Sequence, residues 1–256
     1  MLKVNANIQK LPRHFLPKDF QVTTWEDLQP YFDELKNREL DSAEALQQWL
    51  RDMSETEAAI SEDACWRQIK MTCDTTNKQL EESFNYFCLH IQPHLQAYSD
   101  LLNKKLVNCK YTSQLDQSAY FTYLRNVKNA IELFREKNIP LQSELSVMQQ
   151  QYGQIAGAMT IRVNDQEYTL QQAAKFLESP DRNIREEVFT KTANCRLQDK
   201  DKLDQLFTEI VRKRHQVALN AVFENFLDYK FKALGRFDYT KEDCFAFHIA
   251  IEEKIL

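Results

Sequence analysis

The chain has 256 residues and a mass of 30.3 kDa, which is enough for one large domain or two ordinary ones. Only 3 residues are glycine, where average usage of about 7% would give roughly 18. This scarcity excludes sheet-rich folds, Rossmann domains, P-loops and G-x-S-x-G hydrolases. The net charge of −5 gives no general attraction to nucleic acid or to an anionic membrane.

The sequence also carries none of the usual signals for export or membrane insertion. The N-terminus lacks the apolar core of a signal peptide, and no stretch approaches the roughly 18 apolar residues of a membrane span. Six cysteines are scattered without a C-x-x-C pair, which is typical of reduced cytosolic thiols, and we expect most of them to be buried. These features predict a cytoplasmic protein with no membrane or nucleic-acid partner.

The first elements along the chain are an extended arm and two helices. Residues 1–23 contain two prolines and are predicted to form the arm. Thr24 and Asp27 make a capping box that starts a helix, in which Pro30 should introduce a kink or an end. Asp41 is predicted to start a second helix, which runs to about Thr72.

Three further apolar stripes follow a polar turn at residues 73–77, where Thr76 is the expected helix cap. The stripes extend over residues 84–106, 120–134 and 141–155, and Pro93 should kink the first of them. Joined by short connections, they predict an all-α fold of long antiparallel helices packed as an irregular bundle.

The only β-like segment is a small hairpin predicted near residues 159–169, turning at Asn164-Asp165. A short helix is expected to follow, and Ser179-Pro180-Asp181 predicts a helix start with Pro180 at the first helical position. One long helix is predicted to carry the stripe from Leu203 to Ala221, and Thr240 should cap the last helix.

The chain is interpreted as a single helical region spanning 1–256, with a candidate subdivision near 138–160. The last predicted helix ends on the apolar pair Ile255-Leu256, without a glycine cap or a polar tail. We therefore expect this region to be the N-terminal portion of a larger protein.

Two pairs of side chains have a spacing that catalytic sites use. His90 and His94 are four residues apart, as in the zinc motif H-E-x-x-H, but Ile91 replaces the glutamate and Pro93 disturbs the helix. Cys244 and His248 have the same spacing, yet no orienting asparagine or oxyanion donor accompanies them. We favour structural roles for both pairs.

The densest basic cluster is Arg212-Lys213-Arg214-His215, whose charges point around most of a helix. A solvated face or ion pairs with nearby acids are expected there, not a nucleic-acid site. Adjacent glutamates such as Glu81-Glu82 point apart on a helix and do not form a catalytic carboxylate pair.

Several segments share their order and spacing with one known family over the whole chain: Pro12-Arg13 with Phe15, Phe20 and Trp25; Trp66 with Met71–Asn77; Ile91-Gln92-Pro93; Ser179–Arg182 with Arg185; and Arg214, Ala218, Phe223–Tyr229, Arg236 and Tyr239-Thr240. Together they resemble the N-terminal half of the oligoendopeptidase F family of thimet-oligopeptidase-like zinc metallopeptidases. One departure is Ala221-Val222, where a glycine is expected before Phe223, so the local backbone should differ there.

The resemblance implies that the complete enzyme hydrolyses short peptides. Its zinc is held by an H-E-x-x-H helix and a later glutamate, both in the family's C-terminal half. This chain has neither motif, so no catalytic, cofactor-binding or metal residue is assigned to it, and it is expected to be inactive alone. Its implied partner is the missing catalytic half, and self-association through residues 223–256 is expected in its absence. The alternative is a non-catalytic helical scaffold or interaction module.

Overall fold

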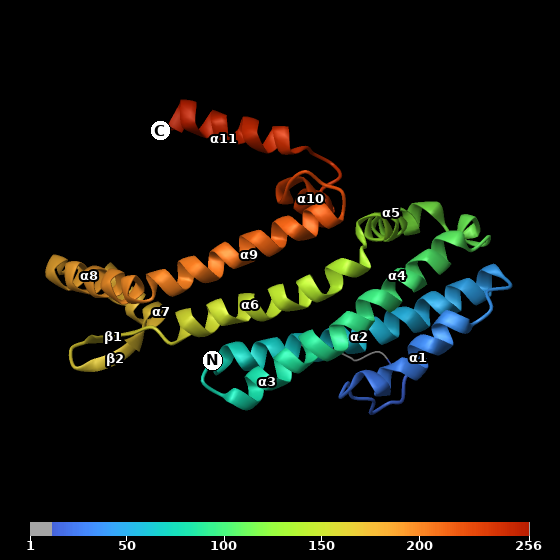
Figure 1. Ribbon diagram of the computed structural model, residues 1–256, viewed down its shortest axis with the longest axis horizontal. Helices are drawn as coiled ribbons and strands as arrows, with labels where there is room; N and C mark the ends of the chain where they lie inside the picture. Colours follow the sequence, from blue (N-terminus) through green and yellow to red (C-terminus); the bar gives the residue numbers. More distant parts are fainter. Residues whose placement is uncertain (1–11, 256) are drawn as a thin grey trace.

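The computed structural model describes residues 12–255 as an elongated, almost entirely helical molecule with one β-hairpin (Figure 1). The helices are α1 (Trp25–Asn37), α2 (Ala43–Cys73), α3 (Lys78–Tyr86), α4 (Gln92–Asn108), α5 (Gln117–Leu133), α6 (Ile139–Gly157), α7 (Leu170–Ala173), α8 (Arg182–Gln198), α9 (Lys200–Asn220), α10 (Phe226–Ala233) and α11 (Lys241–Ile255). The strands are β1 (Thr160–Val163) and β2 (Gln166–Thr169). The predicted all-α fold with a small hairpin is confirmed. No helix in the described range is long and apolar enough to cross a membrane.

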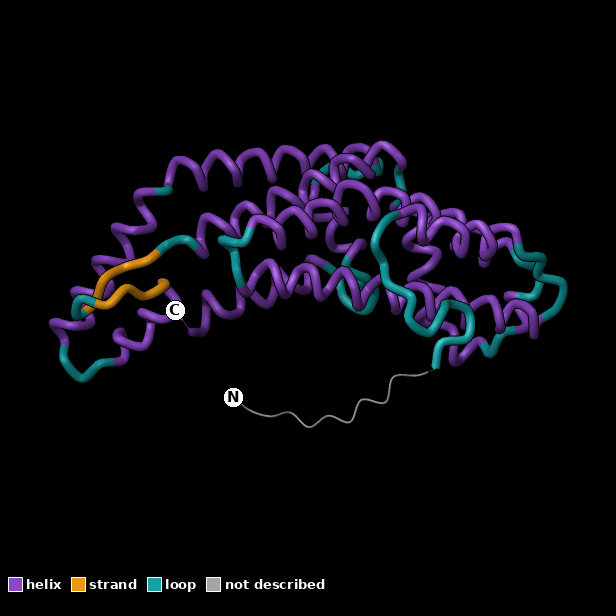
Figure 2. Tube along the Cα trace, turned by 90° about the horizontal axis from the view of Figure 1, so that it is seen from below, coloured by secondary structure: helices purple, strands orange, loops and turns teal. Residues whose placement is uncertain are grey.

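The largest core joins α1, α2, α4 and α5. It is built around side chains with almost no exposed surface, among them Leu28, Leu35 and Trp49. The indole Nε1 of Trp49 donates a hydrogen bond of 2.8 Å to the backbone oxygen of Leu35, so the buried ring has no unsatisfied donor. The long helices run along the length of the molecule in the second view as well (Figure 2).

Two smaller cores continue along the molecule. One joins the end of α5 to α6, α9 and α10 through Leu145, Ile210 and Val217. The other packs the hairpin and α7 against α8, with Val163 and Val188 at its centre. An isolated two-stranded hairpin is marginal, and here the buried face of β1 rests on α8.

The hairpin turns where the sequence predicts. Thr160 pairs with Thr169 and Val163 with Gln166, and the two turn residues Asn164 and Asp165 have φ of 50° and 63°. Positive φ at both central residues is the backbone of a tight primed turn, which asparagine and aspartate tolerate better than most residues.

Residues 12–23 form no helix or strand, and a carboxylate anchors them to α2. Oε1 of Glu55 accepts hydrogen bonds from the backbone N–H groups of Phe15 (3.1 Å) and Leu16 (2.8 Å), and Oε2 accepts one from His14 (2.9 Å). Residues 1–11 of the predicted arm and Leu256 lie outside the described residues.

The capping box of Thr24 and Asp27 is present, and α1 continues through Pro30 as one helix. The irregularity expected at Pro93 takes the form of a π-helical turn, Phe87–Ile91, directly before it. Such a turn lengthens the local hydrogen-bonding pattern, which accommodates a residue that has no N–H to donate.

Several predicted helix starts are wrong by a residue or two. Ser42 caps α2, not Asp41, and Asn77 caps α3, not Thr76, since these side chains accept the first free N–H groups. Asp181 is the cap of α8, which leaves Pro180 just outside the helix. Thr240 and Asp243 form the expected reciprocal pair at the start of α11.

The long helix expected up to Ala221 is α9, which follows α8 after a break at Asp199. At its far end the N–H of Val222 donates to Leu219 (3.0 Å) and that of Phe223 donates to Ala218 (3.0 Å). This is a Schellman ending, whose pivot is usually glycine. Val222 occupies the pivot at φ 68°, so the departure noted in the sequence falls on a strained residue.

Cysteines are less buried than expected. All six are free thiols, but only Cys88 is buried, while Cys65 and Cys73 are exposed. The prediction that most are buried is therefore wrong, because the helix faces that carry them border an open cavity or solvent.

Candidate functional site

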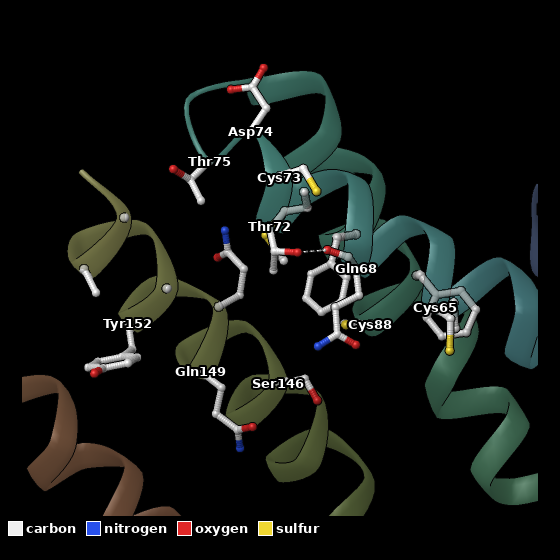
Figure 3. Close-up of a pocket in the computed structure, with 18 of the residues that line it drawn as sticks. Cys65, Gln68, Thr72, Cys73, Asp74, Thr75, Cys88, Ser146, Gln149 and Tyr152 are labelled. Atoms are coloured by element: carbon white, nitrogen blue, oxygen red, sulfur yellow. Dashed lines mark hydrogen bonds between the residues drawn. The ribbon is translucent and has the colours of Figure 1, made fainter. Parts of the chain in front are cut away.

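A cavity of about 990 Å³ opens between the C-terminal part of α2, the segment from α3 to α4, and α6 (Figure 3). Gln68 and Thr72 of α2 lie across it from Ser146 and Gln149 of α6. Its walls come from two stretches that are far apart in the sequence, residues 61–92 and residues 146–171. The lining residues are Ser61, Ala64, Cys65, Gln68, Met71–Thr76, Phe84, Phe87, Cys88, Gln92, Ser146, Gln149, Gln150, Tyr152, Gly153, Ala156, Gly157, Thr169 and Gln171.

Arg67 fixes the α2 wall. Its guanidinium pairs with Asp63 at 2.6 Å, donates to the backbone oxygen of Ser83 at 3.1 Å and donates to that of Val22 at 2.8 Å. One side chain thus joins α2, α3 and the N-terminal segment, with its planar fork used in full. The cavity wall is therefore held by charge-assisted bonds as well as by packing.

The turn between α2 and α3 closes one end of the cavity. Asp74 Oδ1 accepts hydrogen bonds from the backbone N–H of Thr76 (3.3 Å) and from its hydroxyl (2.8 Å), and Asn77 then caps α3. These local bonds give the turn a defined shape without help from the rest of the chain. This turn belongs to the Met71–Asn77 segment that carries part of the family resemblance.

The helix α6 forms the opposite wall, and Gly157 allows it to approach the α2–α3 turn. A Cβ on Gly157 would lie 3.0 Å from the side-chain oxygen of Thr75, so the helix approaches the turn closely there. A Cβ on Gly153 would meet nothing within 4 Å. The cavity is thus closed at Gly157 and open at Gly153.

The chemistry of the lining is neutral. Amides and hydroxyls provide most of the polar groups, and Asp74 is the only charged side chain. Burial raises the pKa of the Cys88 thiol to about 11, so it stays protonated at neutral pH and is a poor nucleophile. The cavity is suited to binding and offers no acid–base or nucleophilic pair.

Gln150 is the unusual member of the lining. Its side chain lies on α6 with only 6% of its surface exposed, and neither Oε1 nor Nε2 has a hydrogen-bond partner among the described residues. Sequence reasoning missed both the cavity and this residue, because the run Gln149–Gln151 has no catalytic pattern and only the packing reveals which of the three amides is buried.

The two histidines at zinc-motif spacing do not converge. The ring of His90 lies 4.8 Å from that of Tyr86, while His94 stacks on Trp25 at 4.8 Å with an interplanar angle of 12°. Within residues 12–255, no three His, Cys, Asp or Glu side chains are grouped closely enough to hold a metal ion. Each histidine packs on a different aromatic ring, and the pair forms no site.

Cys244 and His248 lie on α11, a helix with no buried residue. The hydrogen bonds of the described residues include none between the two side chains, and the His248 ring lies beside that of Phe247. The pair has neither the contact nor the enclosure that an activated thiol needs.

The basic cluster pairs with acids, as expected. Arg212 bonds Glu209 at 2.7 Å, Lys213 pairs with Glu144 of α6, and the guanidinium of Arg214 lies over the Phe226 ring at 5.7 Å. These contacts brace α9 against α6 and α10. The charges therefore point in different directions and make no continuous basic stripe.

Comparison with protein-family sequence models finds a match for the first part of the chain. Residues 15–134 match the sequence model of the family described as Peptidase M3 N-terminal domain. The match covers the first core and the α2–α3 turn. No curated protein matches the chain by sequence.

Solved structures extend the likeness to most of the chain. One described as oligoendopeptidase F has 21% identity and a TM-score of 0.86, with 91% of this chain and 41% of that chain covered. PZ peptidase A with an inhibitor has 20% identity and a TM-score of 0.85, with 92% of this chain and 42% of that chain covered. A structure described as oligoendopeptidase F from Bacillus anthracis strain Ames has 18% identity and a TM-score of 0.86, with 94% of this chain and 45% of that chain covered.

The resemblance predicted from the sequence is confirmed: residues 15–134 match the Peptidase M3 N-terminal domain, and the chain shares its fold with structures described as oligoendopeptidase F. At these identities the structures establish the fold alone. The chain spans about two fifths of the length of the solved structures it matches.

Proposed function

We propose that this chain is the non-catalytic N-terminal portion of a zinc-dependent oligoendopeptidase that hydrolyses short peptides. The observation that carries the proposal is the match of residues 15–134 to the Peptidase M3 N-terminal domain, together with the fold shared with oligoendopeptidase F. In this role the helices form part of the wall or lid around the peptide channel of the complete enzyme.

The residues of this chain supply no step of the chemistry. In the complete enzyme a zinc ion held by an H-E-x-x-H motif would supply Lewis-acid chemistry, and the chain has no such motif to hold it. The one histidine pair at zinc-motif spacing does not fit a zinc site, since His90 and His94 lie against different aromatic rings. We therefore assign no catalytic, cofactor-binding or metal residue and expect the chain to be inactive alone.

The test compares two forms of the protein. Zinc content and cleavage of an internally quenched peptide are measured for the 256-residue chain and for the full product of its native gene. We expect zinc and cleavage in the full product only. Stoichiometric zinc in the short chain, accompanied by cleavage, would contradict its inactivity.

We further propose that residues 12–255 act as one helical region, with 138–160 as the point where it subdivides. The helix α6 and the hairpin at this point connect the large first core to the two smaller ones. The six free cysteines support a reducing compartment, and we propose the cytoplasm.

The alternative function, a helical interaction module, is favoured by one observation. The last segments expose large apolar side chains, including Leu227, Phe245, Phe247 and Ile255. We propose that residues 223–256 drive self-association of the isolated chain. Light scattering should then show a mass that rises with concentration, and a monomer at high concentration would count against this surface.

A further inference from the structure

A second cavity, of about 1080 Å³, opens between α2, α5 and the start of the described chain. The buried side chains of Leu50 and Met53 give it an apolar floor, and the half-buried rings of Tyr120 and Tyr123 line its α5 side. Ala119 also lines it and is exposed, so the cavity is open to solvent. We call it the α2–α5 groove.

The groove holds one carboxylate that lacks a compensating cation. Burial alone raises the pKa of Glu57, so no cation among the described residues offsets its charge. Burial and, after it, the charge of Glu57 raise the pKa of the Tyr123 hydroxyl, which places the carboxylate beside that ring. Glu55 is bonded to backbone N–H groups, and Arg13 donates to the backbone oxygen of Phe20 at 2.8 Å. The groove therefore favours a ligand that combines apolar side chains with a cation.

The eleven residues that precede the described chain have that composition. Apolar and polar residues alternate strictly from Leu2 to Gln9, which is the pattern of an extended segment with one apolar face. The apolar positions are Leu2, Val4, Ala6 and Ile8. The segment also carries Lys3 and Lys10 and has no acidic residue, so its charge is opposite to that of Glu57.

The segment starts at the groove and is long enough to cover it. Pro12, the first described residue, lines the groove, and Glu55 holds the backbone of residues 14–16 against α2. The α2 part of the lining extends over residues 47–62, which is about 22 Å of helix at 1.5 Å per residue. Eight extended residues, such as 2–9, span about 26 Å.

We propose that residues 1–11 dock in the α2–α5 groove as an extended segment. The apolar face of the segment packs on the floor formed by Leu50 and Met53, and a lysine ammonium pairs with Glu57 beside the Tyr123 ring. The groove is thus an intramolecular docking surface for the N-terminal arm. This docking does not depend on the peptidase function.

The test places a photoreactive residue on each face of the segment in the full 256-residue chain. In one variant p-benzoylphenylalanine replaces Ile8, on the apolar face, and in the matched control it replaces Gln9, on the polar face. After irradiation, mass spectrometry should find crosslinks from position 8 to Met53 or Tyr120 of the same chain, about tenfold above those from position 9. No crosslink from position 8 to the groove would overturn the proposal, and so would equal yields from the two positions.

Trypsin cleavage after Lys10 measures how firmly the segment is held, because a docked segment must first be released. Glu57→Gln removes the anion of the groove and should speed this cleavage about tenfold. The control is Glu82→Gln, at an exposed glutamate of α3 that does not line the groove, and it should be cleaved at the parent rate. Equal rates in the parent and Glu57→Gln would overturn the docking.

A second pair of variants changes only the segment, so the folded helices stay intact. Val4→Asp puts a charge on the apolar face and should speed cleavage about tenfold. Asn5→Asp adds the same charge to the polar face and should stay close to the parent. Equal rates in these two variants would overturn the proposed orientation and with it the docking.

The crosslinked product also distinguishes this chain's own segment from that of a second copy. The proposal requires a product with the mass of one chain at every protein concentration. A product with twice that mass, formed in place of the single-chain product, would show that a second copy fills the groove and would overturn the intramolecular docking.

Discussion

The two halves of the molecule use their apolar residues differently. Up to residue 134 the described chain buries 22 hydrophobic side chains and exposes 6 large ones, whereas from residue 135 it buries 12 and exposes 15. The first half closes around one core, and the second half presents apolar faces of α8, α9 and α11 that no other part of the described chain covers. Large uncovered apolar faces mark surfaces that meet another polypeptide.

This difference follows the extent of the sequence match. The matched residues 15–134 coincide with the closed half, while residues 135–255 share only the fold of the solved structures. The first half should thus be stable by itself, and the second half should depend on what covers it. All three tryptophans lie in the first half, so tryptophan fluorescence reports its unfolding alone.

Trp49→Ala should have the largest effect, because it empties the centre of the first core. The indole is fully buried and bonded to Leu35, and a truncation of this kind costs about 3–5 kcal/mol. The unfolding free energy is measured by urea titration followed at 222 nm and by fluorescence of the remaining tryptophans.

The matched control is Phe207→Ala on α9, where 64% of the side chain is exposed. It should change the unfolding free energy by less than about 0.5 kcal/mol. A comparable loss in both variants would contradict the distinction between a closed and an uncovered half.

Glu55→Gln tests the anchor of the N-terminal segment. Burial acts to raise the pKa of Glu55, but the backbone N–H groups of His14, Leu16 and Phe15 outweigh it and hold the pKa below its ordinary value of 4.5. The substitution weakens three charge-assisted bonds, and we expect a loss of about 1–2 kcal/mol at pH 7.

The stability difference between the parent and Glu55→Gln should depend on pH. A carboxylate with a lowered folded-state pKa stabilises the fold above the unfolded value and loses that effect as the pH falls through the folded one. The parent and Glu55→Gln should therefore differ at pH 7 and converge in acid, as measured by urea unfolding. The exposed Glu82 supplies the control Glu82→Gln, which should match the parent at both pH values.

Val222→Gly should stabilise the second half. A β-branched residue at φ 68° carries about 1–3 kcal/mol of strain, which glycine removes at a smaller entropic cost, so we expect a net gain of about 1 kcal/mol. Amide hydrogen exchange at the end of α9 measures this gain in local stability. The reciprocal variant Gly235→Ala, at φ 66° after α10, should lose stability. Equal behaviour of the two variants would contradict the assigned strain.

Gly153→Ala and Gly157→Ala should give the smallest effects. Both replace glycine in α6, which favours the helix by about 0.5–1 kcal/mol. Gly153 has room for the methyl group, but at Gly157 the group meets Thr75 at 3.0 Å and the turn must shift. Thermal unfolding should show a gain for the first and a smaller gain or a loss for the second. A larger gain at Gly157 would refute the close approach of α6 to the turn.

The helices and the hairpin could be predicted because their signals are local. Apolar spacing, the Thr24–Asp27 box and the Asn164-Asp165 turn depend on neighbours within a few residues. Helix starts at Ser42 and Asn77 were missed because adjacent polar residues compete for the cap and the three-dimensional path decides between them.

The cavity could not be predicted, because its walls are separated by about 80 residues along the chain. Of the three consecutive glutamines Gln149–Gln151 only Gln150 is buried, and which of the three the packing of α6 covers cannot be read from identical neighbours in the sequence. The sequence did indicate the unusual backbone before Phe223, where a glycine is expected. Val222 occupies that position and has a positive φ, the conformation that glycine adopts most easily.

The most direct test of the proposed peptidase role is the intact mass of the protein made from its native gene in its native cells. We expect a mass more than twice the 30.3 kDa of this chain, because the solved structures it matches are covered over only 41% to 45% of their length. A mass of 30.3 kDa would contradict the assignment to one portion of a larger peptidase and favour the interaction module.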